Sequence, residues 1–365
     1  MATTEISYPA AGSLNLTSML DSVKVRTDAP SLDVQVYRCL EDDVDTAEFF
    51  STRIYAFNGI VELTGLGRLI EEELRRAGLS YDYFEVTFGR VGFPIFRALH
   101  CERLPLAGFD PRCSFLTCSD RSAVHEDTYI RLAWIDDSAT ATSYAVQVVG
   151  IDSSGAPCTS GRKFDISGSG FIAHQAKDLL DYALNRGDDG DDRVDMQEAR
   201  YIAITMGRRQ RIFFLAKDSS YLAFSFRNMF NATEFADVPG ILTVKSKYDR
   251  ESTICNGLAR QYDRKAERTY EVQTPALASW QVQELEQLIA SRSVSLKVAS
   301  APEKWMPVLI TDHTIETDND DESLSTVKFS FRFASDRVPL TADEIARICH
   351  NGGGVFSSQF NPVFA

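Results

Sequence analysis

Short segments that alternate apolar and polar side chains follow one another along most of this chain. Each is rich in β-branched or aromatic residues, and turn pairs such as Asn58-Gly59 and Asn256-Gly257 separate them. A period of two is that of a β-strand with one buried face. We therefore predict strands at Leu32–Leu40, Ser51–Leu63, Tyr83–Gly89, Tyr129–Ile135, Ser143–Ile151, Tyr201–Met206, Arg211–Ala216, Tyr221–Phe226, Ile241–Tyr248 and Arg268–Thr274.

Four segments follow the helical period instead. In Thr64–Ser80 an apolar stripe lies between Thr64, which is placed to cap the first turn, and Gly78, which is placed to end the last one. The other three are Phe171–Leu184, Pro275–Arg292 and a segment that runs from a capping box at Thr341–Glu344 to Gly354. Many strands with isolated helices predict a mainly β fold, with sandwich-like or barrel-like antiparallel domains and about four short covering helices.

A chain of 365 residues is longer than one hydrophobic core usually serves. The apolar pattern breaks near residues 95–105 and again in the acidic stretch Arg186–Glu198. We therefore expect four segments. They are an N-terminal β-domain with one helix (1–95), a middle β-rich domain or insertion ending in an acidic linker (96–198), a C-terminal β-domain with one helix (199–340), and a capped helix with a flexible aromatic tail (341–365).

Charge and composition narrow the classes of function. The formal net charge is −14, and such an acidic balance repels both phosphate backbones and anionic lipid. We expect no sequence recognition of nucleic acid and no insertion into a membrane. The N-terminal residues lack a basic segment followed by an apolar one, and the seven cysteines are scattered without a CxxC pair. These features predict synthesis in the cytoplasm with reduced thiols.

No segment carries a catalytic, cofactor or metal signature. The glycines at 65 and 67 resemble a phosphate-binding turn, but the third glycine of that motif is replaced by Ile70, so a capped helix start is the better interpretation. One window gathers residues of the types that bind zinc, although adjacent residues on a strand diverge, and buried thiols are favoured instead. These residues are His100, Cys101, Cys113, Cys118 and His125. We predict no catalytic residues, no cofactor and no metal.

Two clusters of charge remain as interaction candidates. Trp305–Ala334 predicts two antiparallel strands joined by the loop Glu316–Glu322, which holds five carboxylates. A charged connection discourages unwanted pairing at the sheet edge, and we expect Asp318, Asp320 and Asp321 to meet a basic patch on a neighbouring subunit. Arg208, Arg209 and Arg211, expected at an exposed hairpin tip, are the candidate patch.

From Tyr221 onward the order of elements becomes specific. The segment "YLAFSFRNMFNATEFADVPGILTVKSKYDR" is followed by "RTYEVQTPALASWQVQELEQLIASRSVSL", by "WMPVLITDHTI", by the acidic loop and by "VKFSFRFA". This order resembles tail structural proteins of Bacteroidetes phages and prophages, in particular their distal-tail or baseplate β-domain proteins. The N-terminal "FFSTRIYAFNGIVELTGLGRLIEEEL" is similar to the opening β-domain of such proteins.

The resemblance implies a non-enzymatic structural subunit of a virion or injection-system tail. Such a subunit is made in the host bacterial cytoplasm and assembles into a ring, commonly hexameric, with copies of itself and with other tail proteins. The last segment, Val355–Ala365, carries Phe356, Phe360 and Phe364 after a run of glycines. Two roles remain open for it: docking on a neighbouring subunit, or pairing as an edge strand on its own domain.

Two other classes of function compete with this one. A carbohydrate-binding or receptor-binding β-sandwich module would present an exposed aromatic side chain from Trp134, Trp280 or Trp305. A carboxylate-dependent glycosidase would use acids from 188–198 or 316–322. A catalytic pair of acids needs a fixed separation inside a cleft, so two solvated loops make the glycosidase the weaker alternative.

Overall fold

The computed structural model places the chain in two compact units, each described by itself. The residues described are 3–39, 46–103, 109–135, 143–166, 170–184, 196, 198–216, 220–256, 258–298, 304–315, 324–335, 345 and 347–348. Unit 1 comprises Met1–Thr117, Ala133–Asp137 and Asn228–Ala232. Unit 2 comprises Cys118–Leu132, Ser138–Arg227 and Thr233–Ala365. The expected division into four segments differs from this one, because strands at 121–124, 143–165 and 198–215 share one sheet.

Unit 1 consists of two β-sheets and one helix around a common core. Its elements are β1 (Thr3–Ser7), β2 (Leu14–Leu16), η1 (Thr17–Met19), β3 (Ser22–Thr27), β4 (Ser31–Cys39), β5 (Thr46–Tyr55), β6 (Ile60–Thr64), α1 (Leu66–Ala77), β7 (Tyr81–Phe88), β8 (Val91–Gly92) and β9 (Phe96–Leu99). One sheet has the order β1-β3-β6, and the other has the order β2-β9-β7-β4-β5 with β8 paired to β7. Valines of β3, β4 and β6 share the core with phenylalanines of β7.

Helix α1 shows why its glycines are needed. Gly65 at its N-terminus and Gly78 at its C-terminus both have left-handed backbone conformations, with φ of 69° and 71°. Gly67 packs so closely on η1 that a Cβ atom would lie 2.0 Å from the Thr17 carbonyl oxygen. Gly65, rather than the expected Thr64, is the capping residue, and it makes no side-chain cap. These glycines therefore serve backbone conformation and close packing.

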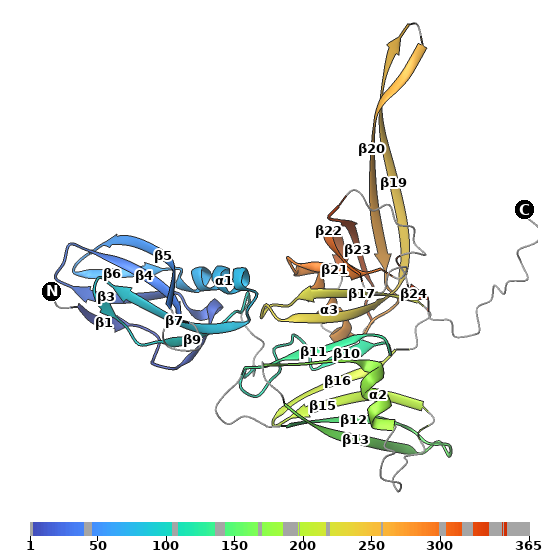
Figure 1. Ribbon diagram of the computed structural model, residues 1–365, viewed down its shortest axis with the longest axis horizontal. Helices are drawn as coiled ribbons and strands as arrows, with labels where there is room; N and C mark the ends of the chain where they lie inside the picture. The colour runs from blue at the N-terminus through green and yellow to red at the C-terminus, as the bar shows by residue number, and fades with distance from the viewer. Residues whose placement is uncertain are drawn as a thin grey trace, which may run out of the picture. The chain divides into compact units, whose positions relative to one another are not determined.

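Unit 2 contains most of the remaining strands (Figure 1). They are β10 (Arg121–Val124), β11 (Tyr129–Ala133), β12 (Ser143–Ile151), β13 (Pro157–Asp165), β14 (Phe171–Gln175), β15 (Glu198–Met206), β16 (Arg209–Leu215), β17 (Ser220–Arg227), β18 (Thr233–Pro239), β19 (Ile241–Cys255), β20 (Leu258–Gln273), β21 (Val294–Lys297), β22 (Trp305–Ile315), β23 (Val327–Phe333) and β24 (Arg347–Ile348). Its helices are α2 (Ala176–Leu184) and α3 (Ser279–Ala290). A five-stranded sheet has the order β10-β16-β15-β12-β13, and β11 pairs with β14. The largest sheet has the order β18-β17-β21-β22-β23-β20-β19, with β24 added on β17.

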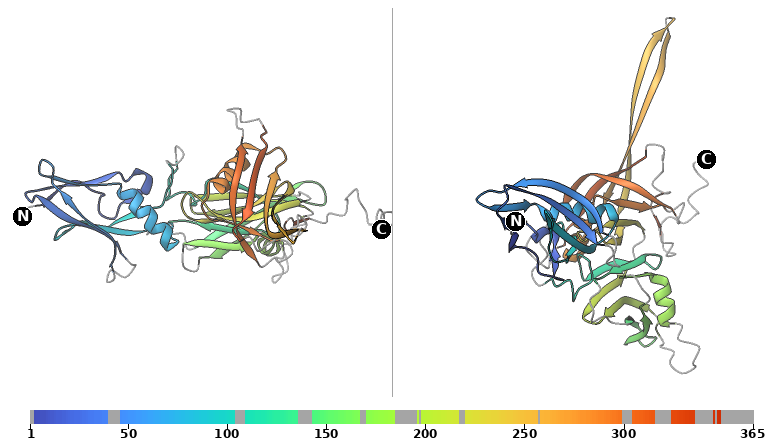
Figure 2. Two further views of the ribbon diagram at one scale, coloured as in Figure 1. Left: turned by 90° about the horizontal axis from the view of Figure 1, so that it is seen from above. Right: turned by 60° about the vertical axis from the view of Figure 1, so that its left-hand side comes forward.

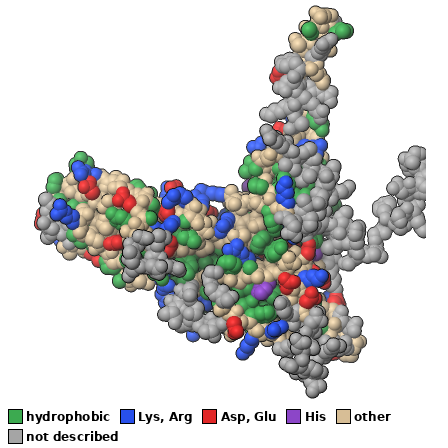
Figure 3. Space-filling model, viewed as in Figure 1, with side chains coloured by type: hydrophobic (Ala, Val, Ile, Leu, Met, Phe, Trp, Pro, Cys, Tyr) green, Lys and Arg blue, Asp and Glu red, His purple; other side chains and the backbone are tan. Residues whose placement is uncertain are grey.

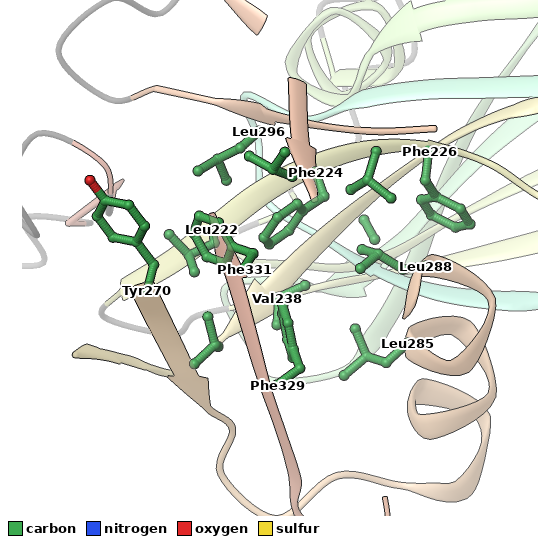
Figure 4. Packing of buried hydrophobic residues seen from close by; sticks show 14 of the residues in the cluster. Leu222, Phe224, Phe226, Val238, Tyr270, Leu285, Leu288, Leu296, Phe329 and Phe331 are labelled. Carbon is green, nitrogen blue, oxygen red and sulfur yellow. The ribbon is translucent and has the colours of Figure 1, made fainter. Parts of the chain in front are cut away.

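The core of unit 2 forms where α3 covers this largest sheet. Figure 4 shows Leu285 and Leu288 of α3 near Phe329 and other aromatic side chains of the sheet. Leu288, Phe224 and Phe331 are fully buried. Burying one such side chain stabilises the fold by roughly 1.5–3 kcal/mol, so this cluster accounts for much of the stability of the unit.

The mainly β fold class is confirmed, with multiple antiparallel sheets. The predicted pair of strands around the acidic loop is also confirmed, since β22 and β23 pair antiparallel from Val308↔Phe333 to Ile315↔Val327. Three α-helices are described rather than four, and the helix expected at 341–354 lies almost wholly outside the described residues. The helix predicted from Phe171 begins only at Ala176. Residues Phe171–Gln175 form a strand because their burial alternates around Ile172, which is the period of a strand.

We predict that Leu288→Ala lowers the free energy of unfolding by about 2–5 kcal/mol, because it leaves a cavity between α3 and the sheet. Urea denaturation followed by tryptophan fluorescence measures the loss. Leu258→Ala is the matched control, since that side chain is 64% exposed and its truncation should change the value by less than about 0.5 kcal/mol. Equal losses in the two variants would contradict this assignment of the core.

Candidate assembly surface

The hairpin of β19 and β20 extends far beyond the sheet to which it belongs (Figures 1 and 2). The two strands pair from Ile241↔Gln273 to Cys255↔Leu258. Strand β20 also pairs with β23, but only along Tyr270–Gln273. Beyond that point the described strands β19 and β20 pair with each other alone. We call the part from Lys245 to Thr269 the arm; its described strands form a two-stranded ribbon about 30 Å long.

The base of the hairpin is buried, whereas the arm is exposed. Tyr270 and Val272 are 1% and 0% exposed, and the Tyr270 ring stacks on Phe331 with centroids 5.3 Å apart. Along the arm, the described side chains of 245–248, 251–256, 258, 259, 261 and 267 are all exposed. A two-stranded hairpin without a packed face is marginally stable in water by itself. The arm therefore depends on its base, or on a partner, for its order.

The tip of the arm carries apolar side chains. Ile254 and Leu258 are 77% and 64% exposed on either side of a turn in which Asn256 has a φ of 52°. Figure 3 shows hydrophobic side chains at this end of the hairpin. The pairing slips by one residue after Glu251, so that β20 carries the extra residue of a β-bulge while β19 stays continuous. A solvated ribbon that ends in aliphatic side chains has the character of an interaction element.

The charge of the arm opposes that of the whole chain. Lys245–Thr269 holds seven basic and four acidic residues, whereas the chain has a net charge of −14. At the base, the Lys245 and Lys328 ammonium groups lie 2.6 Å and 3.1 Å from the Glu271 carboxylate. These hydrogen bonds lower the pKa of Glu271. Exposed ion pairs of this kind contribute little to stability.

The predicted basic cluster is only partly exposed. The tip between β15 and β16 exists as expected, and Arg208 is exposed there. Arg209 and Arg211 are 8% and 2% exposed, so the expectation of an exposed tip is wrong for them. They alternate with exposed residues on β16 and point to its buried face. Asp318, Asp320 and Asp321, like Phe356, Phe360 and Phe364, lie outside the described residues.

Arg211 belongs to a buried polar cluster that sequence reasoning missed. Its guanidinium lies 3.0 Å from Glu234 of β18 and 3.5 Å from Glu284 of α3, and the Ser122 hydroxyl donates to Glu284. Desolvation raises the pKa of Glu284 to about 8, although Arg211 and Ser122 act in the opposite direction. One guanidinium cannot neutralise two buried carboxylates, and Glu234 has the shorter contact. Glu284 therefore takes the proton, and the cluster ties α3 to β16 and β18.

Three of the five residues of zinc-binding type have other contacts or surroundings that disfavour ligation. His125 binds the Asp237 carboxylate through Nδ1 at 3.0 Å and stacks on the Tyr221 ring. Cys101 donates its thiol to the Arg103 carbonyl. Desolvation, followed by two nearby glutamates, raises the pKa of the Cys118 thiol well above its usual value, which disfavours the thiolate that a metal needs.

Two further clusters within single units resemble chemical sites but are better explained as structure. In unit 1, the ligand atoms of Glu71, His100 and Glu102 converge within 4.8 Å, yet Arg75 already supplies a cation 2.8 Å from Glu71 and 3.6 Å from Glu102. In unit 2, Asp237 lines a small pocket, but its carboxylate already accepts hydrogen bonds from the Thr128 hydroxyl and the His125 backbone N–H.

No protein-family model matches this chain, and no curated protein matches it either. The resemblance to tail proteins therefore stays a prediction. Among the helices that the structure describes, none combines the length and the apolar character needed to cross a bilayer.

We predict a pH signature for the buried cluster. The folded chain binds the Glu284 proton more tightly than the unfolded chain does, since the pKa rises from 4.5 to about 8. The stabilisation from this group is complete below the unfolded pKa and is lost as the pH rises toward 8. Glu284→Gln, which does not titrate, should therefore lose less stability than the wild type between about pH 5 and pH 8 in urea denaturation.

Glu286→Gln is the matched control for this measurement. It makes the same replacement on the same helix, at a half-buried position. It should keep the pH dependence of the wild type. The same pH slope in the Glu284 variant and the wild type would contradict the assignment of the proton to Glu284.

Proposed function

We propose that this chain is a non-enzymatic structural subunit that assembles through protein–protein interfaces, with the arm of β19 and β20 as its main intermolecular element. The observation that carries the proposal is that the described arm side chains from Lys245 to Glu267 are exposed and that Ile254 and Leu258 lie at the tip. The resemblance to phage tail and baseplate proteins supplies the setting: a ring of copies of this chain, joined to other tail proteins in the virion.

The physics of an isolated ribbon supports this proposal. The arm has no apolar face of its own to bury, so keeping its strands ordered costs conformational entropy that few contacts within the described chain offset. Strand addition at an open edge supplies both backbone hydrogen bonds and side-chain contacts. Strand β19 is the last in the order of its sheet and is fifteen residues long, which is a long edge for a chain to leave open unless another strand covers it.

The carbohydrate-binding alternative lacks its expected aromatic platform. Trp134 is 3% exposed. Trp280 and Trp305 are half-buried and pack on Phe214 and Phe235, with centroids 5.6 Å and 5.4 Å apart. Sugar-binding tryptophans present an open ring face, so we do not favour this class. The acids of the glycosidase alternative at 316–322 lie outside the described residues.

We predict that shortening the arm abolishes assembly while the rest of the chain still folds. Residues 249–265 are replaced by Asn-Gly, which joins Tyr248 to Ala266, its partner in the ladder. Because the buried base from Tyr270 onward is untouched, the thermal midpoint should stay within a few degrees of the wild type. Sedimentation velocity and negative-stain electron microscopy should show the full chain assembled and the shortened chain monomeric.

Two outcomes would contradict the proposal. One is a full chain that remains monomeric at high concentration, both alone and mixed with virion components. The other is a shortened chain that assembles as well as the full one. The double variant Ile254→Ser with Leu258→Ser separates the contribution of the apolar tip from that of the strand edge, since it leaves the ladder intact.

A further inference from the structure

The outer edge of β19 has a sequence that is complementary to itself when read in the reverse direction. Around Tyr248, the strand reads Leu-Thr-Val-Lys-Ser-Lys before it and Asp-Arg-Glu-Ser-Thr-Ile after it. Position by position outward from the centre, the facing pairs are Lys247 and Asp249, Ser246 and Arg250, Lys245 and Glu251, Val244 and Ser252, Thr243 and Thr253, and Leu242 and Ile254. A strand with this pattern matches a second copy of itself in antiparallel pairing.

We infer that β19 pairs antiparallel with β19 of a second copy of this chain, about a two-fold axis at Tyr248. This inference rests on the proposed function in taking the arm as the intermolecular element, and it goes further by fixing the partner, the strand and the register. It is an isologous, edge-to-edge contact, in which each copy presents the same strand. It makes a two-fold dimer, and the ring of the proposed function would be built from such dimers.

The register follows from charge. Centred on Tyr248, the pairing places Lys245 and Lys247 opposite Glu251 and Asp249 of the other copy, and the symmetry repeats both pairs. Shifting the centre by one residue brings either two lysines or two aspartates directly opposite each other, at position 247 or at position 249. Opposite charges across an antiparallel pair stabilise it, and like charges destabilise it. The register centred on Tyr248 has four attractive pairs, whereas its neighbours on either side each introduce a repulsive one.

The structure of the arm meets the conditions for this pairing. Strand β19 is at the end of the sheet order, and the β-bulge residue is on β20, so the outer strand is regular. Lys245, Tyr248, Glu251 and Ile254 are all exposed. Within its own hairpin, Glu251 stands in the ladder opposite another acid, Asp263. The ammonium group of Lys245 has three donors, so its contact with Glu271 does not prevent a second one.

Cross-linking tests the register. In a Cys255→Ser background, Tyr248→Cys places the two thiols at the symmetry centre, where the Cα atoms of an antiparallel pair are about 4.5–5.5 Å apart, within disulfide range. Ser246→Cys is the matched control. Its two copies stand four residues apart in this register, about 13 Å, which is too far for a disulfide. We expect a cross-linked dimer under mild oxidation from the first variant only. Cross-linking of neither, or of both equally, would overturn the register.

Charge exchange provides a second test. In a homodimer of either single variant, Lys245→Glu or Glu251→Lys, like charges stand opposite each other at two places. We therefore expect association through the arm to weaken about tenfold or more. The first variant carries an acid at both positions, 245 and 251, and the second carries a lysine at both. Mixing the two variants therefore makes both of these pairs attractive again. Analytical ultracentrifugation of the equimolar mixture should restore the wild-type affinity as a heterodimer.

The outcomes separate this inference from the proposed function. If arm shortening abolishes assembly but the mixed variants do not associate, the two-fold pairing is wrong and the arm binds elsewhere. If arm shortening leaves assembly intact, both the proposed function of the arm and the two-fold pairing are wrong. Association of the mixed variants, when neither variant associates by itself, supports the antiparallel register. A purely structural role of Lys245 would not produce this rescue, and neither would non-specific binding by a basic arm.

Discussion

The stacking of Tyr270 on Phe331 is the interaction on which the architecture of the arm depends. It involves Tyr270, the first residue of β20 that pairs with β23, so it lies where the arm joins the sheet. Strand β20 is therefore buried at its C-terminal end and exposed to solvent along the arm. Tyr270 and Val272 contribute to the core over which α3 packs, while the residues before them are in solvent. The core holds the arm at its base, and among the described strands β19 stands at the end of the sheet order.

The parts of the fold that could be predicted from sequence are those in which hydrophobic burial sets the pattern. Alternation predicted β22 and β23, and an apolar stripe ending at Gly78 predicted α1. The same rule explains the error at Phe171–Gln175. A short strand with one buried residue, Ile172, looks like the first turn of the helix that follows it. It is a strand because it pairs with β11, a tertiary contact that the local sequence does not reveal.

The arm escaped prediction for the opposite reason. Patterning found its base, Ile241–Tyr248 and Arg268–Thr274, and the Asn256-Gly257 turn, but not the strands between them. The described residues there have no buried face, so their charged sequence carries no alternation. The buried cluster was missed because charged residues are read as exposed. Arg211 and Glu284 are buried only because strands and a helix distant in sequence bring them together.

If the proposed assembly is right, the outer edge of β19 becomes covered when the chain assembles. Hydrogen exchange measures this directly, because an amide at an open strand edge exchanges faster than one in a ladder. Exchange is followed by mass spectrometry at increasing protein concentration. Peptides covering Leu242–Ile254 should exchange more slowly as the chain assembles, while the exchange of peptides from the buried core should stay the same. Assembly that proceeds with no change in the exchange of these peptides would contradict the claim.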